Sequence, residues 1–184
     1  MLELWGREKW VRHQAFIDQQ LEAVTDLLLQ TAAVRVGEAV LDVGCGPGAT
    51  LLRLAAVVGK EGHVLGCDVS APMLALARQR IAAAGIRNVD VVQADAQSHG
   101  FAENAFDLVI SRFGVMFFAD PTAAFAKLRQ PLKPGGRLAF VCWAPLADNP
   151  FFLLPIQIAT RHLGPVEPTP PRAPGPLAFS QPDM

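Results

Sequence analysis

The sequence predicts a doubly wound α/β fold built on a mostly parallel, Rossmann-like sheet. Two observations carry this prediction. Short apolar runs alternate with helix-like runs through residues 37–143, and a glycine-rich turn at residues 44–48 follows the first of these apolar runs. Alternating strands and helices imply right-handed crossovers, with helices on both faces of the sheet. Such open sheets bind ligands at the carboxyl ends of their strands.

The expected elements follow in chain order. Residues 11–33 are expected to form one amphipathic helix, because Ile17, Leu21, Val24 and Leu28 recur at helical spacing. The predicted strands are 39–43, 63–68, 89–94, 106–111 and 136–143, and the predicted helices between them are 50–58, 71–84 and 122–130. The strands are short and nearly continuously apolar, as in a sheet that is covered on both faces.

Local end signals support the helix at 71–84. Ser70 is expected to cap its N-terminus, Pro72 suits its first turn, and Gly85 follows its last turn. The segment Lys133-Pro134-Gly135-Gly136 is expected to be the turn into the last strand, with an architectural role.

The chain divides into three predicted segments: a helical cap at 1–36, a ligand-binding domain at 37–143 and a proline-rich segment at 144–184. The last segment holds ten of the fifteen prolines. Residues 165–176 are expected to form a loop or an extended linker, because proline disrupts helices and central strands. No helix or strand is predicted after residue 143.

Composition narrows the function classes. The chain has 184 residues and a formal net charge of −1, so it has no global electrostatic case for binding nucleic acid. No apolar run approaches the roughly 20 residues that span a bilayer. Three cysteines without paired spacing indicate buried thiols in a reducing cytoplasm. The four histidines show no metal-ligand spacing, so no metal site is predicted.

Acidic residues near the glycine turn indicate which kind of ligand it binds. Asp42 precedes Gly44 by two positions, and a carboxylate there favours a ligand that carries positive charge. Asp68 follows the second strand 24 positions after Gly44, which suits hydrogen bonds to a ribose. Asp95 follows the third strand, and Ser111 and Arg112 end the fourth. Together these positions predict a nucleoside ligand with a cationic group.

Three alternatives bear on this interpretation. Asp68 could instead cap a helix. The turn can also be written G-x-G-x-x-A, a dinucleotide fingerprint, which keeps an NAD(P)-dependent oxidoreductase open as an alternative. A Walker A loop is excluded, because no Gly-Lys-Ser/Thr follows. The carboxylate of Asp42, which would repel a pyrophosphate, and Asp95, placed to meet an adenine edge, argue against the dinucleotide.

Five ordered motifs resemble those of the class I S-adenosylmethionine-dependent methyltransferases. They are Val40-Leu-Asp-Val-Gly-Cys-Gly-Pro-Gly48, Gly66-Cys-Asp-Val-Ser70, Gln93-Ala-Asp-Ala-Gln97, Phe106-Asp-Leu-Val-Ile-Ser111 and Leu132-Lys-Pro-Gly-Gly-Arg137. The resemblance covers about residues 38–143. Within that class, the Trp-containing N-terminal helix and the segment Ser111-Arg-Phe-Gly-Val-Met-Phe-Phe118 are similar to ubiquinone/menaquinone-biosynthesis-like small-molecule methyltransferases.

The resemblance implies S-adenosyl-L-methionine as cofactor and a role for each matching position. Gly44, Cys45, Gly46 and Gly48 would lie along the methionine part, and Asp42 would hold its ammonium group, directly or through water. Asp68 would bind the ribose hydroxyls. Val69 and Met73 would pack on the adenine, or serve as plain core residues, and Asp95 with the Ala96 amide would meet its edge. Ser111 or Arg112 would offer backbone polar contacts near the methionine group.

The acceptor is expected to be a small apolar or planar molecule. Aromatic residues and one methionine are concentrated in the segments that would face it: Trp5, Trp10, Phe113, Met116, Phe117, Phe118, Trp143, Phe151 and Phe152. Several of them could equally cover the sheet. No catalytic base is identified, and surface roles are favoured for His13 and His99.

The resemblance also implies an antiparallel strand pair after the fifth strand, and this chain shows no segment for it. A truncated chain is favoured, with a catalytically inactive cofactor-binding fragment as the alternative function. A second copy of the chain could cover the exposed sheet edge.

Overall fold

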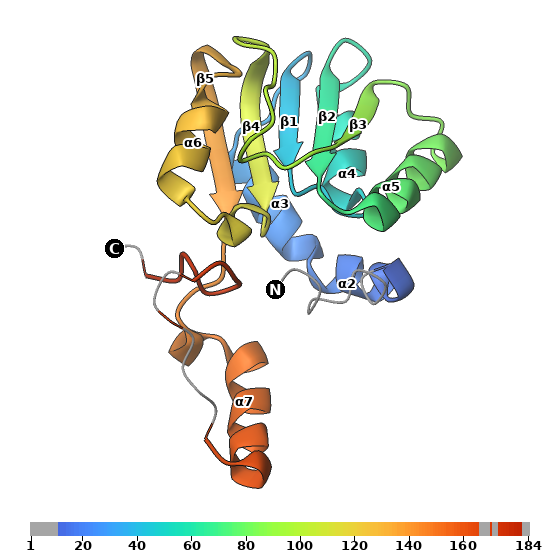
Figure 1. Cartoon of the computed structure of the whole chain (residues 1–184). Helices are drawn as coiled ribbons and strands as arrows, with labels where there is room; N and C mark the ends of the chain where they lie inside the picture. Colours follow the sequence, from blue (N-terminus) through green and yellow to red (C-terminus); the bar gives the residue numbers. More distant parts are fainter. Residues whose placement is uncertain (1–10, 166–169, 171–172, 182–184) are drawn as a thin grey trace.

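Five parallel strands form one sheet in the order β3-β2-β1-β4-β5 in the computed structural model of the chain (Figure 1). The structure describes residues 11–165, 170 and 173–181. The strands are β1 (Ala39–Val43), β2 (His63–Asp68), β3 (Val89–Gln93), β4 (Phe106–Arg112) and β5 (Leu132–Val141). The doubly wound prediction is confirmed. Strand order reverses between β1 and β4, so a ligand site is expected at their carboxyl ends.

Helices cover both faces of this sheet. One core lies between the sheet and α3 (Glu22–Thr31), α4 (Ala49–Val58) and α5 (Ala71–Ala83). The other lies under α6 (Pro121–Arg129) and the short η2 (Val115–Phe117). Alternate residues of β1 serve the two cores, because successive strand side chains point to opposite faces. Val40 belongs to the first core and Leu41 to the second, and both are fully buried.

The predicted single helix at 11–33 is wrong, because the chain forms α2 (Gln14–Gln20) and α3 with a break at Leu21. The Thr25 hydroxyl donates to the Leu21 carbonyl, which lies four residues earlier in the chain, at 2.9 Å. Such back-bonding from threonine commonly bends a helix. The predicted acceptor residues Trp5 and Trp10 lie outside the described residues.

The segment predicted as a turn before the fifth strand lies inside β5. Phe106 pairs with Leu132, and Leu108 pairs with Arg137, so two steps along β4 match five along β5. Gly135 in this bulge has a φ of +79°. The prediction that β5 begins at residue 136 is therefore wrong by four residues.

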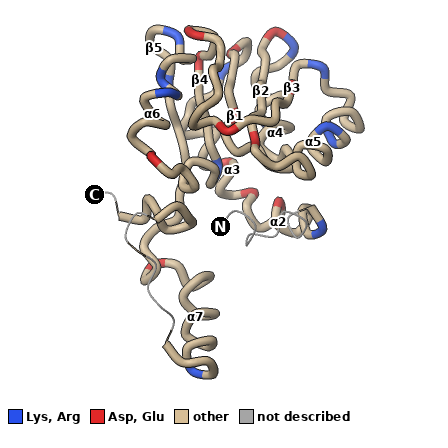
Figure 2. The backbone as a smooth tube through the Cα atoms, viewed as in Figure 1, with Lys and Arg blue, Asp and Glu red and all other residues tan. Residues whose placement is uncertain are grey.

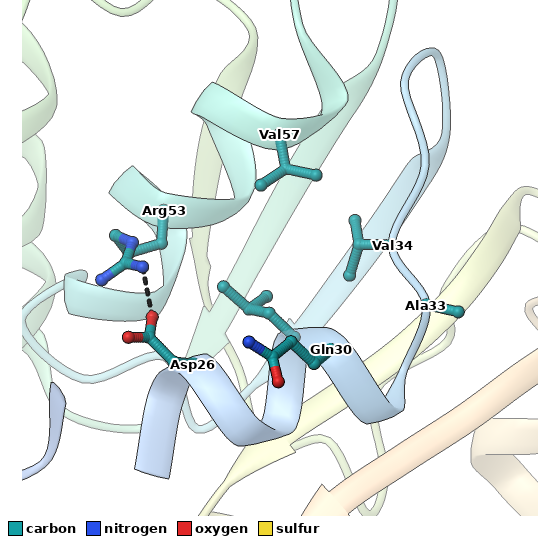
Figure 3. Close-up of a pocket in the computed structure, with 7 residues that line it drawn as sticks. Asp26, Gln30, Ala33, Val34, Arg53 and Val57 are labelled. Carbon is teal, nitrogen blue, oxygen red and sulfur yellow. Dashed lines mark hydrogen bonds and ion pairs between the residues drawn. The ribbon is translucent and has the colours of Figure 1, made fainter. Parts of the chain in front are cut away.

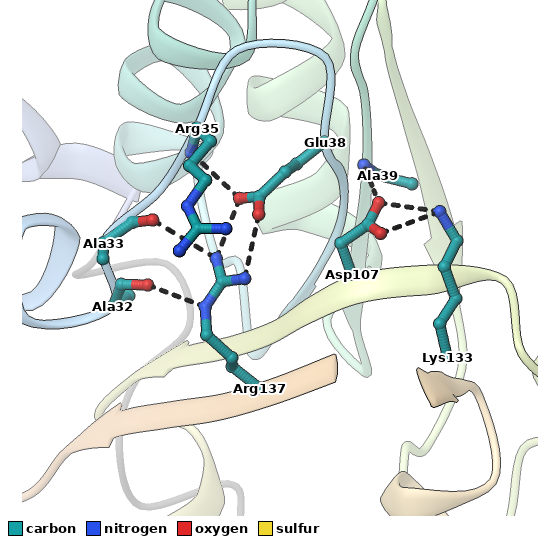
Figure 4. A network of polar contacts seen from close by, with 8 residues as sticks. All are labelled: Ala32, Ala33, Arg35, Glu38, Ala39, Asp107, Lys133 and Arg137. Atoms are coloured by element: carbon teal, nitrogen blue, oxygen red, sulfur yellow. Dashed lines mark hydrogen bonds and ion pairs between the residues drawn. The ribbon is translucent and has the colours of Figure 1, made fainter. Parts of the chain in front are cut away.

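Ion pairs fasten the start of β5 to the rest of the sheet (Figure 4). Arg137 donates to the Glu38 carboxylate at 2.9 Å and to the carbonyl of Ala32 at 3.1 Å. Burial acts to raise the pKa of Glu38, but hydrogen bonds from Arg137 and a backbone amide outweigh it, so the net pKa is lowered. Lys133 donates to both oxygens of Asp107, at 2.9 and 2.8 Å. This network lies at the amino edge of β1 and β4, away from their carboxyl ends, and its role is architectural.

The segment after β5 departs from the sequence prediction. The short η3 (Leu146–Asp148) and the 14-residue helix α7 (Pro150–Leu163) follow β5, and α7 extends away from the sheet domain (Figure 1). The prolines argued against a helix in this segment. Pro150 nevertheless occupies the first turn, where proline is tolerated, and Pro155 is the single proline in the interior of the helix. Charged residues are interspersed over the sheet domain, whereas α7 is drawn almost entirely in tan (Figure 2).

Residues 173–181 return to the sheet domain. The Gly175 amide donates to the Met116 carbonyl at 2.9 Å, and the Phe179 ring lies 6.0 Å from that of Phe125 between ring centroids. The part of the predicted linker that the structure describes beyond residue 172 is therefore packed.

The expected absence of an antiparallel strand pair holds for the described residues, since β5 is the last strand there. Leu138 and Phe140 of β5 are 39% and 42% exposed. Cover of this edge by a second copy stays a prediction. No helix in the described part of the chain is long and apolar enough to cross a membrane.

Candidate functional site

The glycine turn connects β1 to α4 at the carboxyl edge of the sheet. Gly44, Gly46 and Gly48 all have positive φ, at +73°, +53° and +87°. Gly44 also permits a close approach, because a Cβ there would lie 2.7 Å from the Cα of Gly114 in the loop after β4. The Gly44 amide donates to the Cys67 carbonyl at the end of β2. The turn is thus fixed against both neighbouring strands before any ligand arrives.

Asp68 braces this turn from the end of β2. One carboxylate oxygen accepts from the Gly46 amide at 2.9 Å, and the other accepts from the Ser70 amide at 2.8 Å. The carboxylate therefore closes the turn that leads into α5, since Ser70 is the residue directly before this helix, while it also touches the glycine turn. A carboxylate offers about four acceptor positions, so it can accept from several donors at once, as a ligand that binds vicinal ribose hydroxyls requires. The hydroxyl of Ser70, which was predicted to cap the helix, makes no hydrogen bond to the described residues.

Asp42 is the most unusual group of the site. Its side chain is fully buried on β1, and neither oxygen has a hydrogen-bond partner among the described residues. Burial raises the pKa of Asp42 to about 7; the nearby charge of Arg112 acts to lower it, and that of Asp68 acts to raise it. A buried carboxylate without donors is costly, and a cationic ligand group would remove that cost. This orphaned pair of oxygens fits the predicted ammonium site.

Arg112 lies on the same face of the sheet as Asp42. Asp42 is paired with Ile110 across β1 and β4, and Arg112 follows two positions later on that face. Its guanidinium donates to the Thr25 hydroxyl of α3 at 2.8 Å. Burial lowers the pKa of Arg112, while the carboxylates of Asp42 and Asp18 act to raise it.

A second arginine connects the N-terminal helices to the glycine turn. Arg80 of α5 donates to the Pro47 carbonyl in the turn at 2.8 Å and to the Asp18 carboxylate of α2 at 2.7 Å. The Arg80 and Asp18 side chains are only 21% and 19% exposed. We name this Asp18–Arg80–Pro47 connection the α2 latch. It holds α2 beside the turn, in which Gly46 and Gly48 are buried.

Among the other predicted site residues, Ser111, Cys45 and Ala96 are buried, whereas Asp95 is exposed. Ser111 is fully buried, and its hydroxyl donates to the Val43 carbonyl at 2.7 Å, so its side chain fastens β4 to β1. The buried Cys45 side chain belongs to the first core and that of Ala96 to the second. Asp95 is exposed beside the end of β3 and accepts from the Gln97 amide at 3.0 Å.

The predicted adenine contacts lie near the turn. Val69 is 39% exposed just after β2, as a side chain that could meet a ligand would be. The sulfur of Met73, in the first turn of α5, lies 3.7 Å from where a Cβ on Gly46 would be. The predicted positions Asp42, Asp68, Met73 and Arg112 are therefore brought to the same edge of the sheet.

Sequence reasoning missed Asp18, Thr25 and Arg80. Their partners lie 62, 87 and 33 positions away along the chain. No local motif marks such long-range pairs. The one available signal is that Asp18 and Thr25 are polar residues within a predicted amphipathic helix.

Aromatic rings gather beyond the glycine turn on the loops after β4 and β5. Phe113 stacks on Trp143 with ring centroids 4.4 Å apart and an interplanar angle of 9°. Trp143 stacks in turn on Phe151 at 5.9 Å and 6°, and Phe152 meets it edge-on at 5.0 Å. Phe113 has a φ of +63°, which is uncommon for a bulky residue and typical of functional loops. Because Gly114 touches Gly44, this cluster begins beside the turn.

A groove of about 430 Å³ lies elsewhere, between α3 and α4 (Figure 3). Its residues include Leu29, Val34 and Val57, and Arg53 pairs with Asp26 across it. Val57 lies near the carboxyl end of α4, remote from the glycine turn that precedes this helix. The groove is therefore separate from the candidate site.

The arrangement can bind a ligand with three kinds of group. A buried carboxylate suits a cation, a second carboxylate beside a glycine turn suits vicinal hydroxyls, and an aromatic cluster suits a flat apolar molecule. Among the described residues, no group of histidine, cysteine, aspartate or glutamate side chains is placed to hold a metal ion.

The sequence matches a known protein family. The model of a family described as "Methyltransferase domain" matches residues 40–136. Aklanonic acid methyltransferase DauC of Streptomyces sp. (strain C5) is 41% identical over 104 residues, which cover 56% of this chain and 47% of DauC. The ubiquinone/menaquinone biosynthesis C-methyltransferase UbiE of Teredinibacter turnerae is 38% identical over 111 residues, covering 60% of this chain and 45% of UbiE.

Solved structures of other proteins share the fold of this chain. A SAM-dependent methyltransferase from Aquifex aeolicus superposes with a TM-score of 0.61 at 28% identity, covering 65% of this chain and 64% of that one. The [4+2]-cyclase SpnF gives a TM-score of 0.61 at 31% identity, covering 66% and 44%. The chain spans about half the length of the curated relatives that it matches.

Proposed function

The chain belongs to the methyltransferase domain family, whose model matches residues 40–136 of its 184, and from this premise we propose that it transfers a methyl group from S-adenosylmethionine to a small molecule. The observation that carries the proposal is the buried carboxylate of Asp42, which has no donor among the described residues and lies at the strand end before the glycine turn. An NAD(P) pyrophosphate would place negative charge beside this carboxylate, whereas an α-ammonium group would neutralise it.

The residues present fit the cofactor. Asp42 would meet the ammonium group, Asp68 the ribose hydroxyls, and Val69 with Met73 the adenine, with Asp95 and the Ala96 amide at its edge. When bound, S-adenosylmethionine supplies a methyl group on a positively charged sulfonium. The sulfur is a good leaving group because it departs as a neutral thioether, so the acceptor can attack the methyl group directly and no protein nucleophile is needed.

The protein's own contribution is alignment and the exclusion of water. The turn is preorganised by the bonds of Gly44 to Cys67 and of Gly46 to Asp68. The α2 latch ties α2 to the Pro47 carbonyl in this turn. A cofactor bound there would lie beside the aromatic cluster that begins at Phe113.

The acceptor in this proposal is apolar or aromatic. The stacked rings of Phe113, Trp143 and Phe151 support it, because a flat molecule gains stacking and apolar contact on such a surface. The curated relatives named above act, by their names, on aklanonic acid and in quinone biosynthesis. A cyclase shares the fold, however, so methyl transfer is tested separately from binding.

Titration calorimetry with S-adenosylhomocysteine tests the donor site. We expect saturable binding by the wild-type chain and none of comparable affinity with NADH or NADPH. Asp68→Ala should weaken S-adenosylhomocysteine binding roughly 10- to 100-fold, the scale of a charge-assisted hydrogen bond. Tight NADH binding without a response to S-adenosylhomocysteine would overturn the proposal. Binding without turnover, in a screen of quinone and polyketide-like acceptors, would favour the fragment alternative.

A further inference from the structure

Arg112 is a half-buried cation whose position the cofactor-binding turn does not explain. It ends β4, and its guanidinium reaches across to α3, where the Thr25 hydroxyl accepts a hydrogen bond at 2.8 Å. The guanidinium has five N–H donors, and this hydroxyl is the acceptor that the described residues supply to it. A guanidinium that loses part of its hydration ordinarily has an anionic hydrogen-bond partner, because removing hydration from a charge is costly.

The opposite charge lies close by but is not hydrogen-bonded to it. Asp42 and Arg112 sit on neighbouring strands and on one face of the sheet, and each shifts the pKa of the other. Both oxygens of Asp42 nevertheless lack a hydrogen bond from any described residue. A carboxylate and a guanidinium therefore lie on one face of the sheet, each with hydrogen-bonding capacity that the described residues leave unused.

An α-amino-acid group carries the complementary pair. Its ammonium would meet Asp42, and its carboxylate would meet Arg112. The nearby Arg80 is less suited to that carboxylate, because it already donates to Asp18 and to the Pro47 carbonyl.

Thr25 is placed to hold the guanidinium in position. Its side chain is 3% exposed, and its hydroxyl donates to the Leu21 carbonyl while it accepts from Arg112. The hydroxyl hydrogen is thus committed to Leu21, which leaves an oxygen lone pair directed to Arg112.

We infer that the side chain of Arg112 binds the carboxylate of the cofactor's amino-acid group and that Thr25 is its positioning residue. This inference rests on the proposed function and extends it. The Arg112 side chain, in place of the backbone contact expected from the sequence, makes the protein selective for a methyl donor with an intact amino-acid group.

A pair of ligands isolates this role. S-adenosylhomocysteine carries the amino-acid group, and 5′-methylthioadenosine lacks it while keeping the adenine, ribose and thioether. Titration calorimetry on the full chain measures both dissociation constants. Arg112→Gln should weaken S-adenosylhomocysteine binding roughly 10- to 100-fold and change 5′-methylthioadenosine binding by less than about twofold.

Three further variants sharpen the test. Thr25→Val should weaken S-adenosylhomocysteine binding several-fold with little effect on 5′-methylthioadenosine, and Thr25→Ser, which keeps the hydroxyl, should restore it. Arg129→Gln, at an exposed arginine of α6, is the matched control and should leave both affinities unchanged. Circular dichroism confirms that each variant is folded.

The outcomes separate the two proposals. If the wild-type chain binds neither ligand, the proposed function itself fails. If it binds both equally, or if Arg112→Gln weakens both to the same extent or neither, the cofactor site stands and the role of Arg112 is overturned.

Discussion

Replacing Asp42 with asparagine is expected to stabilise the ligand-free protein at neutral and alkaline pH. Burial raises the pKa of Asp42 from its ordinary 3.8 to about 7 in the folded state. In the unfolded chain the group ionises near its ordinary pKa, so above pH 4 folding requires proton uptake or a buried charge. Asparagine has nearly the same shape and carries no charge. The variant therefore avoids this cost.

The magnitude follows from the shift of about three pKa units, each of which is worth about 1.4 kcal/mol. Below pH 4, Asp42 has the least effect on the free energy of unfolding of the wild-type protein. As the pH rises, this free energy falls, and above pH 7 the loss due to Asp42 is about 4 kcal/mol. Near pH 5 the loss is only about 1.5–2 kcal/mol. The advantage of Asp42→Asn should thus grow by about 2–3 kcal/mol between pH 5 and pH 8. Arg112 and Asp68, the charges that act on Asp42, are the same in both proteins.

Urea unfolding at pH 5, 6.5 and 8 measures this difference. Asp148→Asn, at an exposed aspartate of η3, is the control and should give equal stability to wild type at each pH. The same Asp42→Asn variant should bind S-adenosylhomocysteine roughly tenfold more weakly, because the ammonium group loses its counter-charge. A constant stability difference across these pH values, or a destabilised variant, would refute the assignment of Asp42 as a buried, destabilising carboxylate that is held for a ligand.

Two further substitutions test the geometry of the turn and the latch. Gly44→Ala should destabilise the protein by about 2 kcal/mol or more in urea unfolding, since its φ of +73° is strained for alanine and the added Cβ would lie 2.7 Å from Gly114; wild-type stability would contradict this geometry. Asp18→Asn should weaken the ion pair with Arg80 and make S-adenosylhomocysteine dissociate several-fold faster in stopped-flow measurements. An unchanged dissociation rate would show that α2 does not cover the bound ligand.

The sequence allowed the sheet and its ligand-binding edge to be predicted because their signals are local. The strand that holds Asp42 runs directly into the glycine turn, and Asp68 ends the next strand, so the places of both carboxylates followed from the order of the elements along the chain. Thr25 and Arg112 are 87 positions apart, and their contact depends on how α3 crosses the sheet. The break at Leu21 was equally hidden, because the apolar residues keep their helical spacing across it.

Proline content misled the prediction for the C-terminal segment in a specific way. The whole segment after residue 143 was judged by its ten prolines, yet only Pro155 lies in the interior of α7. Position relative to the first helical turn decides whether proline is tolerated, and composition alone cannot show that position.

The residues proposed to bind the methyl donor and those proposed to bind the acceptor are held in place by different parts of the structure. The donor groups Asp42 and Arg112 lie between β1, β4 and α3, so their placement is fixed by the core that the described residues bury. The aromatic cluster instead relies on Phe151 and Phe152 at the start of α7, a helix with no buried residue. Substitutions in the cluster, such as Trp143→Ala, should therefore alter acceptor use while leaving S-adenosylhomocysteine affinity within about twofold, because stacking contacts and the charged site share no side chain. A large loss of S-adenosylhomocysteine affinity in a folded Trp143→Ala protein would show that the two sites are one unit.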